Sequence, residues 1–374
     1  MRIAVDARVL ALAELRGIGS YVSEILAAWP DPDDVFLLFA PRPIPHEGLT
    51  GRARFSSVIV SEPRGSRVRV YDWFSLPRAM RTAGPDLIWS PANQAVPLAG
   101  VPQAVAIHDT LLQERVRHET LLDKLFHCAL SPAFVRRYAS RVICVSGFAA
   151  GRVSRIFNVE ASRIRVIANG ARLPARPFAS RREAREYLAA KGLVDRPYAL
   201  ALGAGSPWKN SEGALRAFAK VSQAAPDIHF VLAGVQPEAK ERLYALRDAL
   251  GLADRLRIHG FVDRRSLEAL YQGARVFVYP SLFEGFGLPP LEAMALSTPV
   301  AASNAASIPE VTGPAAELAD ASNPDALAAA ILAILGDKAR ARELVLAGRR
   351  NIERFSWERS ASAHRRLFTE CLAR

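Results

Sequence analysis

Two carboxylates bracket a glycine-containing turn in the second half of the chain. Glu284 and Glu292 stand eight residues apart, and Gly285 and Gly287 lie between them. Glycine lets a backbone turn tightly and approach a ligand closely. The prolines at 289–290 suit the first turn of a helix, where unpaired amides favour a phosphate. The two carboxylates could therefore face one phosphate-bearing ligand from two sides, although Glu292 alone is as typical of a first-turn carboxylate favoured by the helix dipole.

The elements around this turn place it where α/β proteins bind ligands. Residues 274–279 form an apolar run that predicts a buried strand, and the segment after Leu288 predicts a helix. The turn then lies at the carboxyl end of a strand, which is the binding edge of an open α/β sheet.

A lysine and a histidine follow two other expected strands. Lys209 comes after the run 199–202 and just before an expected helix, where a cation is unfavourable unless an anion binds nearby. Trp208 and Asn210 replace the glycine and the Ser or Thr of a P-loop, so ATP hydrolysis is not predicted. His108 also follows an apolar run, and on position alone a structural role is the commoner one for such a histidine.

The chain opens with a strand, a glycine loop and a helix. Residues 2–6 predict the strand, Gly17 and Gly19 the loop, and residues 20–29 the helix. Val22 stands where the third glycine of the dinucleotide fingerprint would be, so the glycine pair is a weak signal that a mere turn also explains.

Expected strands and helices alternate along most of the chain. Beyond the first strand, the expected strands are residues 35–39, 87–90, 104–107, 142–145, 164–168, 199–202, 229–233, 256–259, 274–279 and 299–302. This alternation predicts parallel, doubly wound sheets. A chain of 374 residues exceeds what one core usually serves, and the proline-containing stretch after Gly170 predicts a linker. We therefore expect an α/β fold with two domains, residues 1–175 and 176–355.

The string from Glu284 to Glu292, which encloses Gly-Phe-Gly-Leu-Pro, resembles the donor-sugar motif of the family 4 retaining glycosyltransferases. The resemblance implies the GT-B fold, in which two Rossmann-like doubly wound domains face a central cleft. It also implies a C-terminal helix, about residues 356–374, that crosses back to the first domain, because the entry around Trp357 is similar. These similarities run in the family's order from Asp6 to Trp357.

The resemblance also implies roles for individual residues. Glu284 would stabilise positive charge on the sugar, His108 would contact the transferred sugar, and Lys209 would neutralise the donor diphosphate. Glu292 would bind the ribose hydroxyls, and Asp109 is a weaker candidate for acceptor contact. The remaining donor-binding residues implied are Gly285, Phe286, Gly287, Leu288, Gly17 and Gly19. No metal and no cofactor are expected, because a lysine and a helix terminus can supply the charge neutralisation that a metal gives elsewhere.

The sequence departs from the family's pattern at one charged position. Family members usually carry an arginine several residues before the lysine, and here Ala204 or Gly205 occupies that place. A hydrogen bond to a charged group is worth about 1.5 to 3 kcal/mol, so without the arginine Lys209 should supply a larger part of the diphosphate binding energy. Ser146 and Asn169-Gly170 resemble other family segments but could simply form a helix cap and a turn, and the Ser307 to Glu310 segment is interpreted as structural.

The donor and acceptor are expected from similarity to bacterial mannosyl- and rhamnosyltransferases of surface polysaccharides. The first choice of donor is GDP-mannose, which supplies mannose, or the donor of a related deoxyhexose, and UDP and dTDP sugars remain alternatives. The expected acceptor is a lipid-linked oligosaccharide or polysaccharide. A non-catalytic nucleotide- or polysaccharide-binding protein on the same fold is the alternative. A nicotinamide-dependent oxidoreductase is disfavoured, since Val22 and Trp208 replace fingerprint glycines.

Composition limits the partners and the compartment. The net charge is +12, and only six of the 49 basic residues are lysine. Arginine-rich base composition explains such a charge as well as an anionic partner does. A cluster of basic and aromatic residues suits an anionic membrane surface better than nucleic acid, since no RNA-recognition signature is present; its members are Arg64, Arg67, Arg69, Tyr71, Trp73 and Phe74. We expect a cytoplasmic protein that can bind the inner face of the cytoplasmic membrane, with three scattered cysteines that stay reduced.

Overall fold

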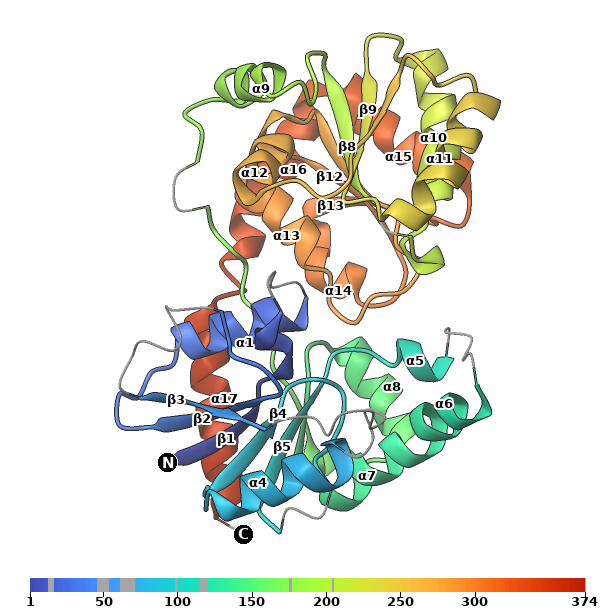
Figure 1. The fold of residues 1–374 in the computed structure, drawn as a ribbon. Coiled ribbons are helices and arrows are strands. Elements are labelled where there is room, and N and C mark those ends of the chain that lie inside the picture. Colours follow the sequence, from blue (N-terminus) through green and yellow to red (C-terminus); the bar gives the residue numbers. More distant parts are fainter. Residues whose placement is uncertain are drawn as a thin grey trace. The chain divides into compact units, whose positions relative to one another are not determined.

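The computed structural model describes residues 1–12, 17–45, 54–60, 71–97, 100–114, 120–174, 177–203 and 205–373. The chain divides into two compact units. The first unit is Met1–Gly170 together with Ser356–Arg374, and the second is Ala171–Phe355. Each unit contains one parallel sheet covered by helices (Figure 1).

The first unit is built on a seven-stranded parallel sheet with the order β3-β2-β1-β4-β5-β6-β7. Strand β1 lies near its middle, where Ile3 pairs with Phe36 on one side and with Leu87 on the other. Its strands are β1 (Arg2–Asp6), β2 (Val35–Ala40), β3 (Phe55–Ile59), β4 (Leu87–Ser90), β5 (Gln103–Ile107), β6 (Arg141–Cys144) and β7 (Ile164–Val166). Because β1, β4, β5 and β6 are fully or almost fully buried, their carboxyl ends are fixed points from which loops emerge.

Helices of the first unit include the last helix of the chain. They are α1 (Ile18–Ala27), α4 (Leu76–Thr82), α5 (Leu111–Glu114), α6 (Leu121–Leu125), α7 (Ser131–Tyr138), α8 (Gly147–Phe157) and α17 (Trp357–Leu372). Ser146 caps α8, since its hydroxyl accepts a hydrogen bond from the Ala149 amide at 3.0 Å.

The return of α17 to the first unit confirms the expected crossing of the last helix. Helix α17 packs against α1, β4 and β5. Gly170 makes room for the helix entry, because a Cβ there would lie 2.4 Å from the backbone nitrogen of Trp357. Arg365 pairs with Asp31 and with the buried carboxylate of Asp34, so the turn before β2 holds the helix.

The second unit carries a six-stranded parallel sheet with the order β10-β9-β8-β11-β12-β13. Its strands are β8 (Tyr198–Leu202), β9 (His229–Ala233), β10 (Leu256–Ile258), β11 (Val276–Tyr279), β12 (Val300–Ser303) and β13 (Ala316–Ala319). Its helices are α9 (Arg181–Ala190), α10 (Ser211–Ala224), α11 (Pro237–Ala249), α12 (Arg264–Gly273), α13 (Leu288–Ala295), α14 (Ile308–Thr312), α15 (Pro324–Gly336) and α16 (Lys338–Ile352). Strands β8 and β11 are neighbours, with Leu200 opposite Phe277, so their carboxyl ends lie side by side.

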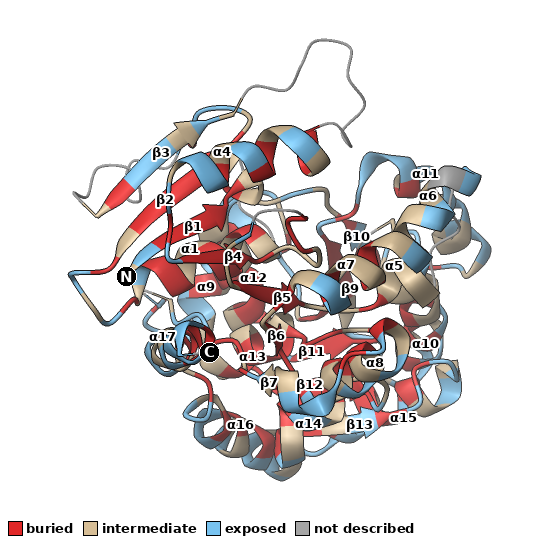
Figure 2. Ribbon diagram, turned by 90° about the horizontal axis from the view of Figure 1, so that it is seen from below, coloured by how far each residue is buried: buried red, intermediate tan, exposed pale blue. Residues whose placement is uncertain are grey.

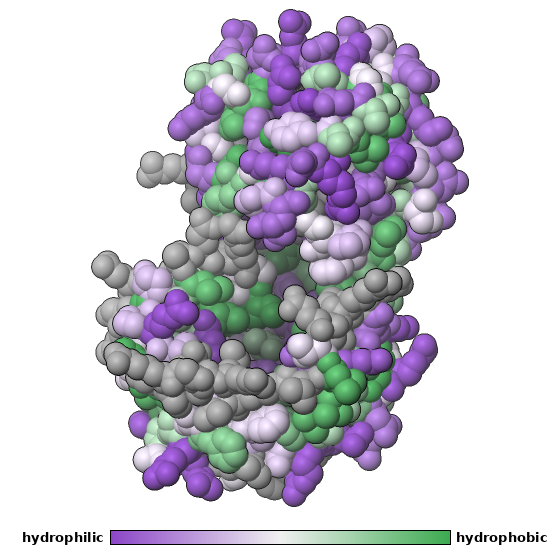
Figure 3. All heavy atoms as spheres, turned by 45° about the vertical axis from the view of Figure 1, so that its right-hand side comes forward, coloured by the Kyte–Doolittle hydropathy of each residue, from purple (hydrophilic) through white to green (hydrophobic). Residues whose placement is uncertain are grey.

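Burial follows the layers of each unit. Figure 2 shows the central strands in red, whereas the edge strand β3 is partly pale blue. The part of the second unit's surface seen in Figure 3 is mostly hydrophilic, with smaller hydrophobic patches. Among the described residues, no helix combines the length and the apolar character needed to cross a bilayer.

The doubly wound architecture of two Rossmann-like domains confirms the fold expected from the alternating pattern. Two strands were not expected, β3 and β13. The sequence of β3, Phe-Ser-Ser-Val-Ile, is half polar because it lies at a sheet edge where three of its five residues are exposed.

Candidate active site

The glycine-containing turn connects the end of β11 to the start of α13. Gly287 is the residue before the helix and has a φ of +104°, a conformation that L side chains rarely adopt. The Ser307 hydroxyl donates to the carbonyl oxygens of Glu284 and Phe286, at 2.9 and 2.8 Å. Ser307 is fully buried, so the segment interpreted as structural fixes the shape of the turn.

Glu284 pairs with Lys209 across two neighbouring strand ends. The Nζ of Lys209 lies 2.6 Å from Oε1 of Glu284, and the side chains are 29% and 14% exposed. The two loops are also joined through their backbones, because the Leu282 amide donates to the Trp208 carbonyl at 2.7 Å. The structure therefore brings together two residues that the sequence placed on separate loops, 75 positions apart.

Asn210 explains why the lysine loop differs from a P-loop. Asn210 has a φ of +54° and caps α10, since its Oδ1 accepts from the Gly213 amide. Its Nδ2 donates to the carbonyls of Pro280 and Ala321, at 3.2 and 2.7 Å. The asparagine thus anchors the loop that carries Lys209 to the segments that follow β11 and β13.

Glu292 lies on α13 with both of its oxygens engaged. Arg264 donates to Oε1 at 2.9 Å, and the Tyr271 hydroxyl donates to Oε2 at 3.1 Å. Burial and the nearby Glu292 charge raise the pKa of Tyr271 well above its ordinary value, so the phenol stays a donor. No sequence pattern indicated Arg264 or Tyr271, because both come from α12 and reach Glu292 only through helix packing.

Lys209 and Arg264 each lie beside one of the predicted glutamates. Gly205, which stands near the place of the family's arginine, supplies no charge, and Ala204 lies outside the described residues. Among the described residues, no cluster of three or more His, Cys, Asp or Glu side chains is arranged to hold a metal ion.

His108 follows β5 in the first unit and is held in one orientation. Its backbone amide donates to Oδ1 of Asn93, and its Nε2 lies 2.8 Å from the Pro91 carbonyl. A carbonyl can only accept, so Nε2 carries the proton and Nδ1 is the acceptor of the neutral ring. Burial lowers the pKa of His108 to about 4, in spite of the Pro91 hydrogen bond, so the ring is neutral near pH 7.

The other residues singled out in the first unit have local structural partners. Oδ1 of Asp109 accepts from the Leu111 amide at 3.0 Å, so Asp109 orders the start of the short helix α5. Gly17 precedes α1 with a φ of +49°, where glycine is favoured, and Gly19 is buried in the first turn of that helix.

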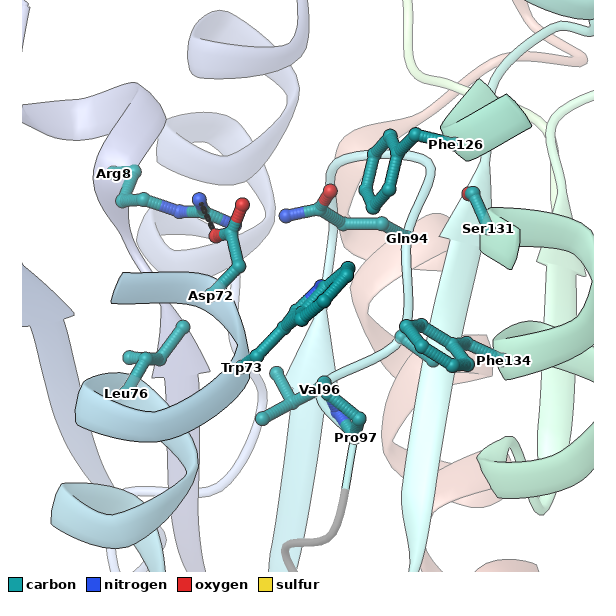
Figure 4. Close-up of a pocket in the computed structure, with 11 residues that line it drawn as sticks. Arg8, Asp72, Trp73, Leu76, Gln94, Val96, Pro97, Phe126, Ser131 and Phe134 are labelled. Carbon is teal, nitrogen blue, oxygen red and sulfur yellow. Dashed lines mark hydrogen bonds and ion pairs between the residues drawn. The ribbon is translucent and has the colours of Figure 1, made fainter. Parts of the chain in front are cut away.

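A small pocket opens at the carboxyl end of the first sheet. Arg8, which follows β1, donates to the buried carboxylates of Asp6 and Asp72. Aromatic side chains of Trp73, Phe126 and Phe134 face the same space (Figure 4). The volume is about 10 Å³, room for about one water molecule, and aromatic faces lie beside the Arg–Asp pair around it.

The basic and aromatic cluster expected at a membrane is only partly described. Arg64, Arg67 and Arg69 lie outside the described residues. Tyr71 is fully buried, which corrects its expected place on the surface, whereas Phe74 is 63% exposed. Tyr71 is buried because its ring packs under Arg8 and in the core cluster that contains Ala4 of β1.

Two Rossmann-like domains, a helix that returns from the end of the chain, and paired charges on the loops after β8 and β11 define the class of GT-B glycosyltransferases. Solved structures agree in fold. Sucrose-phosphate synthase from Thermosynechococcus elongatus matches with a TM-score of 0.80 and 23% identity, covering 100% of this chain and 99% of that one. Anabaena HepE in complex with UDP and glucose matches with a TM-score of 0.80 and 19% identity, covering 99% of each chain.

Sequence comparisons identify the family. The family model for Glycosyltransferase Family 4 matches residues 15–173, and the model for glycosyl transferases group 1 matches residues 184–351. The chain belongs to the family 4 glycosyltransferases, as the Glu284 to Glu292 motif predicted.

Curated relatives cover the chain in part. The O-antigen chain mannosyltransferase B of Escherichia coli is 33% identical over 66% of this chain. The O-antigen chain mannosyltransferase RfbU of Salmonella typhimurium is 26% identical over 66% of each chain. The aligned part spans 62% of mannosyltransferase B, and only 22% of the serotype-specific mannosyltransferase WbdA of Escherichia coli.

Proposed function

We propose that this protein is a retaining glycosyltransferase that moves a hexose from a nucleotide-diphosphate sugar to a lipid-linked saccharide. The observation that carries the proposal is the Lys209–Glu284 pair, 2.6 Å apart at the carboxyl edge of the second sheet. A lysine beside a helix amino terminus suits a diphosphate, and a carboxylate suits the positive charge that develops on a sugar during transfer.

The proposed donor site uses the turn and the two glutamates. The diphosphate takes the place of Glu284 as the partner of Lys209, and the amides of residues 286–288 donate to its oxygens. Glu292, oriented by Arg264 and Tyr271, accepts hydrogen bonds from the ribose hydroxyls. Release from Lys209 leaves Glu284 free to lie beside the sugar ring.

In the proposed reaction the anomeric carbon loses its bond to the diphosphate and gains a bond to the acceptor oxygen on the same face. Glu284 stabilises the oxocarbenium-like charge, and the departing diphosphate takes the proton of the acceptor hydroxyl. Neutral His108 accepts a hydrogen bond from a sugar hydroxyl at Nδ1, since Nε2 is held by Pro91. This scheme needs no separate general base and no metal ion.

The first unit offers a surface suited to a saccharide acceptor. Trp73 and Phe126 supply flat apolar faces, and the Arg8–Asp72 pair supplies polar atoms beside them. Exposed Phe74, adjacent to Trp73, suits the membrane interface at which a lipid-linked acceptor would be presented. Asp109 remains a weaker candidate for acceptor contact.

The donor proposed first is GDP-mannose. Relatives named as O-antigen mannosyltransferases support mannose as the sugar and a surface polysaccharide as the product. UDP and dTDP sugars are the competitors that an experiment must separate.

A nucleotide panel tests the donor site. A ligand at 100 times its dissociation constant adds about 2.7 kcal/mol to the free energy of unfolding, which thermal denaturation detects. We expect GDP to stabilise the protein more than UDP or dTDP, and we expect Glu292→Ala and Lys209→Ala to abolish the effect. The anomeric configuration of the product, read by NMR, tests retention. Stabilisation by no nucleotide would support a non-catalytic protein and contradict the donor site.

A further inference from the structure

The amino-terminal edge of the second sheet gathers arginines that begin its strands. Arg255 and Arg275 directly precede β10 and β11, and Arg196 stands two residues before Tyr198, where β8 begins. The strands are parallel, so their starts lie along one edge. This edge is opposite the one that carries Lys209 and Glu284.

Two helices bring further cations to the same edge. Arg181 is the first residue of α9, and Lys338 is the first residue of α16, with Arg342 one turn later. A hollow of about 1200 Å³ opens among these residues. Six basic side chains and one carboxylate, Asp227, line it; the basic ones are Arg181, Arg196, Arg255, Arg275, Lys338 and Arg342.

These cations are not neutralised by the described part of the chain. None of the six forms an ion pair there, whereas Arg340, on the same helix as Arg342, pairs with both Glu317 and Glu343 at 2.8 Å. The guanidinium of Arg181 donates only to carbonyl oxygens, those of Gln272 and Ser297. Arginines without an ion pair also occur elsewhere on the described surface, Arg350 and Arg366 among them, so what distinguishes the hollow is that six cations line one space with one carboxylate.

The pKa values of two groups at the hollow, Arg181 and His229, are lowered by burial and, in part, by repulsion from these unpaired cations. Burial, followed by repulsion from Arg275 and Arg185, lowers the pKa of Arg181. Burial, followed by repulsion from Arg255 and other arginines, lowers the pKa of His229, which also lines the hollow. Cations at the amino terminus of a helix add to the positive end of its dipole, so α16 raises the potential further.

The hollow also has an apolar side. Leu332 and Leu335 of α15 and Val345 of α16 line it together with the cations. A guanidinium forms two parallel hydrogen bonds to a phosphate, and several arginines around one space suit a ligand with one or more phosphoryl groups. Apolar neighbours suit a ligand whose phosphate is attached to an apolar body.

We propose that this hollow at the amino-terminal edge of the second sheet binds the phosphoryl groups of an anionic ligand, at a site separate from the Lys209–Glu284 edge. The ligand chemistry is shared by two sources, the headgroup of an anionic lipid and a free phosphate or diphosphate.

The test uses the full chain with two exposed cations of the hollow neutralised, Arg275→Gln with Arg342→Gln. The matched control, Arg350→Gln with Arg366→Gln, removes the same charge from exposed positions that do not line the hollow. Partition onto phosphatidylglycerol vesicles, with phosphatidylcholine vesicles as the neutral reference, measures the lipid source. Calorimetric titration with inorganic diphosphate in a Lys209→Ala background measures the free source without the donor site.

For a lipid headgroup we expect the hollow variant to bind phosphatidylglycerol vesicles at least about tenfold more weakly, with less than a twofold change in the control. For a free ligand we expect a similar loss in diphosphate binding while vesicle binding is unchanged. Equal losses in the hollow variant and the control, or no binding in either assay, would overturn the proposal. The Lys209→Ala background keeps this result independent of whether nucleotides bind at the opposite edge.

Discussion

The two edges of the second sheet treat charge in opposite ways. At the carboxyl edge each of the two predicted glutamates faces a cation, Glu284 with Lys209 and Glu292 with Arg264. At the amino edge six basic side chains share one hollow with the single carboxylate of Asp227. The excess positive charge of the chain is therefore unevenly distributed between these two edges. The carboxyl edge has its own ion pairs, and the amino edge is the one where we propose that an external anion binds.

The paired edge also shows why charge can be buried there. Glu284 is 14% exposed, and a carboxylate so covered requires a partner. In the proposed donor complex a diphosphate replaces Glu284 beside Lys209, so the lysine keeps an anionic partner.

The largest effect is expected from Glu284→Gln. Loss of one preorganised electrostatic group costs about 10² to 10³ in kcat, because the amide cannot stabilise the developing positive charge. Nucleotide binding should be largely retained, since Lys209 and the helix amides remain. Steady-state kinetics with the donor found in the nucleotide panel measure both quantities.

Glu317→Gln is the matched control, because Glu317 pairs with Arg340 away from the turn. Near wild-type turnover in Glu284→Gln would remove the catalytic role from the paired edge and leave its ion pairs purely structural.

The first unit extends the comparison, since it buries ionisable groups in their neutral form. His364 on α17 is fully buried, with Nδ1 donating to the Ser360 carbonyl and Nε2 accepting from the Tyr21 hydroxyl at 2.6 Å. Burial lowers the pKa of His364 to about 4, with the Ser360 hydrogen bond opposing the shift and nearby His108 adding to it. The ring therefore contributes stability only while it is neutral.

The second prediction concerns the pH dependence of stability. The unfolded chain binds a proton to His364 near pH 6.5, and the folded protein does so only near pH 4. The free energy of unfolding should fall by about 3 kcal/mol per such histidine as pH falls through this window, and level off below it. Chemical denaturation at several pH values measures the slope. His364→Gln should reduce the slope by about half, since His108 has a similarly lowered pKa, and an unchanged slope in that variant would contradict the assignment.

The sequence predicted the sheets better than their edges. Strands such as β8 and β11 are continuous apolar runs, because both faces of a parallel sheet are covered by helices. The exposed edge strand β3 lacks such a run, and its Ser56 and Ser57 resemble a loop. Local pattern therefore identified all the central strands and the edge strands β7 and β10, and it missed the edge strands β3 and β13.

Some residues of the candidate site could be predicted from the sequence and others could not. Lys209 and Glu284 could be predicted, since each follows a recognisable strand and parallel strands end at one edge. Arg264 could not, because it lies 28 residues from Glu292 and reaches it only through the packing of α12 on α13. Tyr21 and His364 are 343 residues apart and meet only because α17 returns to the first unit.

The third prediction is that Lys209→Met weakens nucleotide binding. A hydrogen bond to a charged group is worth about 1.5 to 3 kcal/mol, so the dissociation constant of the preferred nucleoside diphosphate should rise about 10- to 150-fold. Isothermal titration calorimetry measures this directly, with Lys220→Met as the control because Lys220 pairs with Asp325 elsewhere in the unit. Unchanged affinity would mean that the ligand does not replace Glu284 beside the lysine.

The smallest expected effect is on the free energy of unfolding, which should change in opposite directions when a cation is removed from one edge or from the other. Lys209→Met leaves Glu284 without its partner and should lower the free energy of unfolding by about 1 to 3 kcal/mol. Arg275→Gln removes one of several cations that repel one another and should raise it slightly, within about 0.5 kcal/mol. Denaturant titration in low salt, without added anion, measures both.

The dependence on salt concentration distinguishes repulsion in the hollow from loss of the Lys209–Glu284 ion pair. Repulsion in the open hollow is screened as salt rises, so the gain from Arg275→Gln should disappear, whereas the loss in Lys209→Met should persist because that pair is partly buried. A clear destabilisation by Arg275→Gln at every salt concentration would mean that the amino edge is held together by its arginines. The hollow would then be a structural feature, and the contrast between an ordered edge and an edge that awaits an anion would be lost.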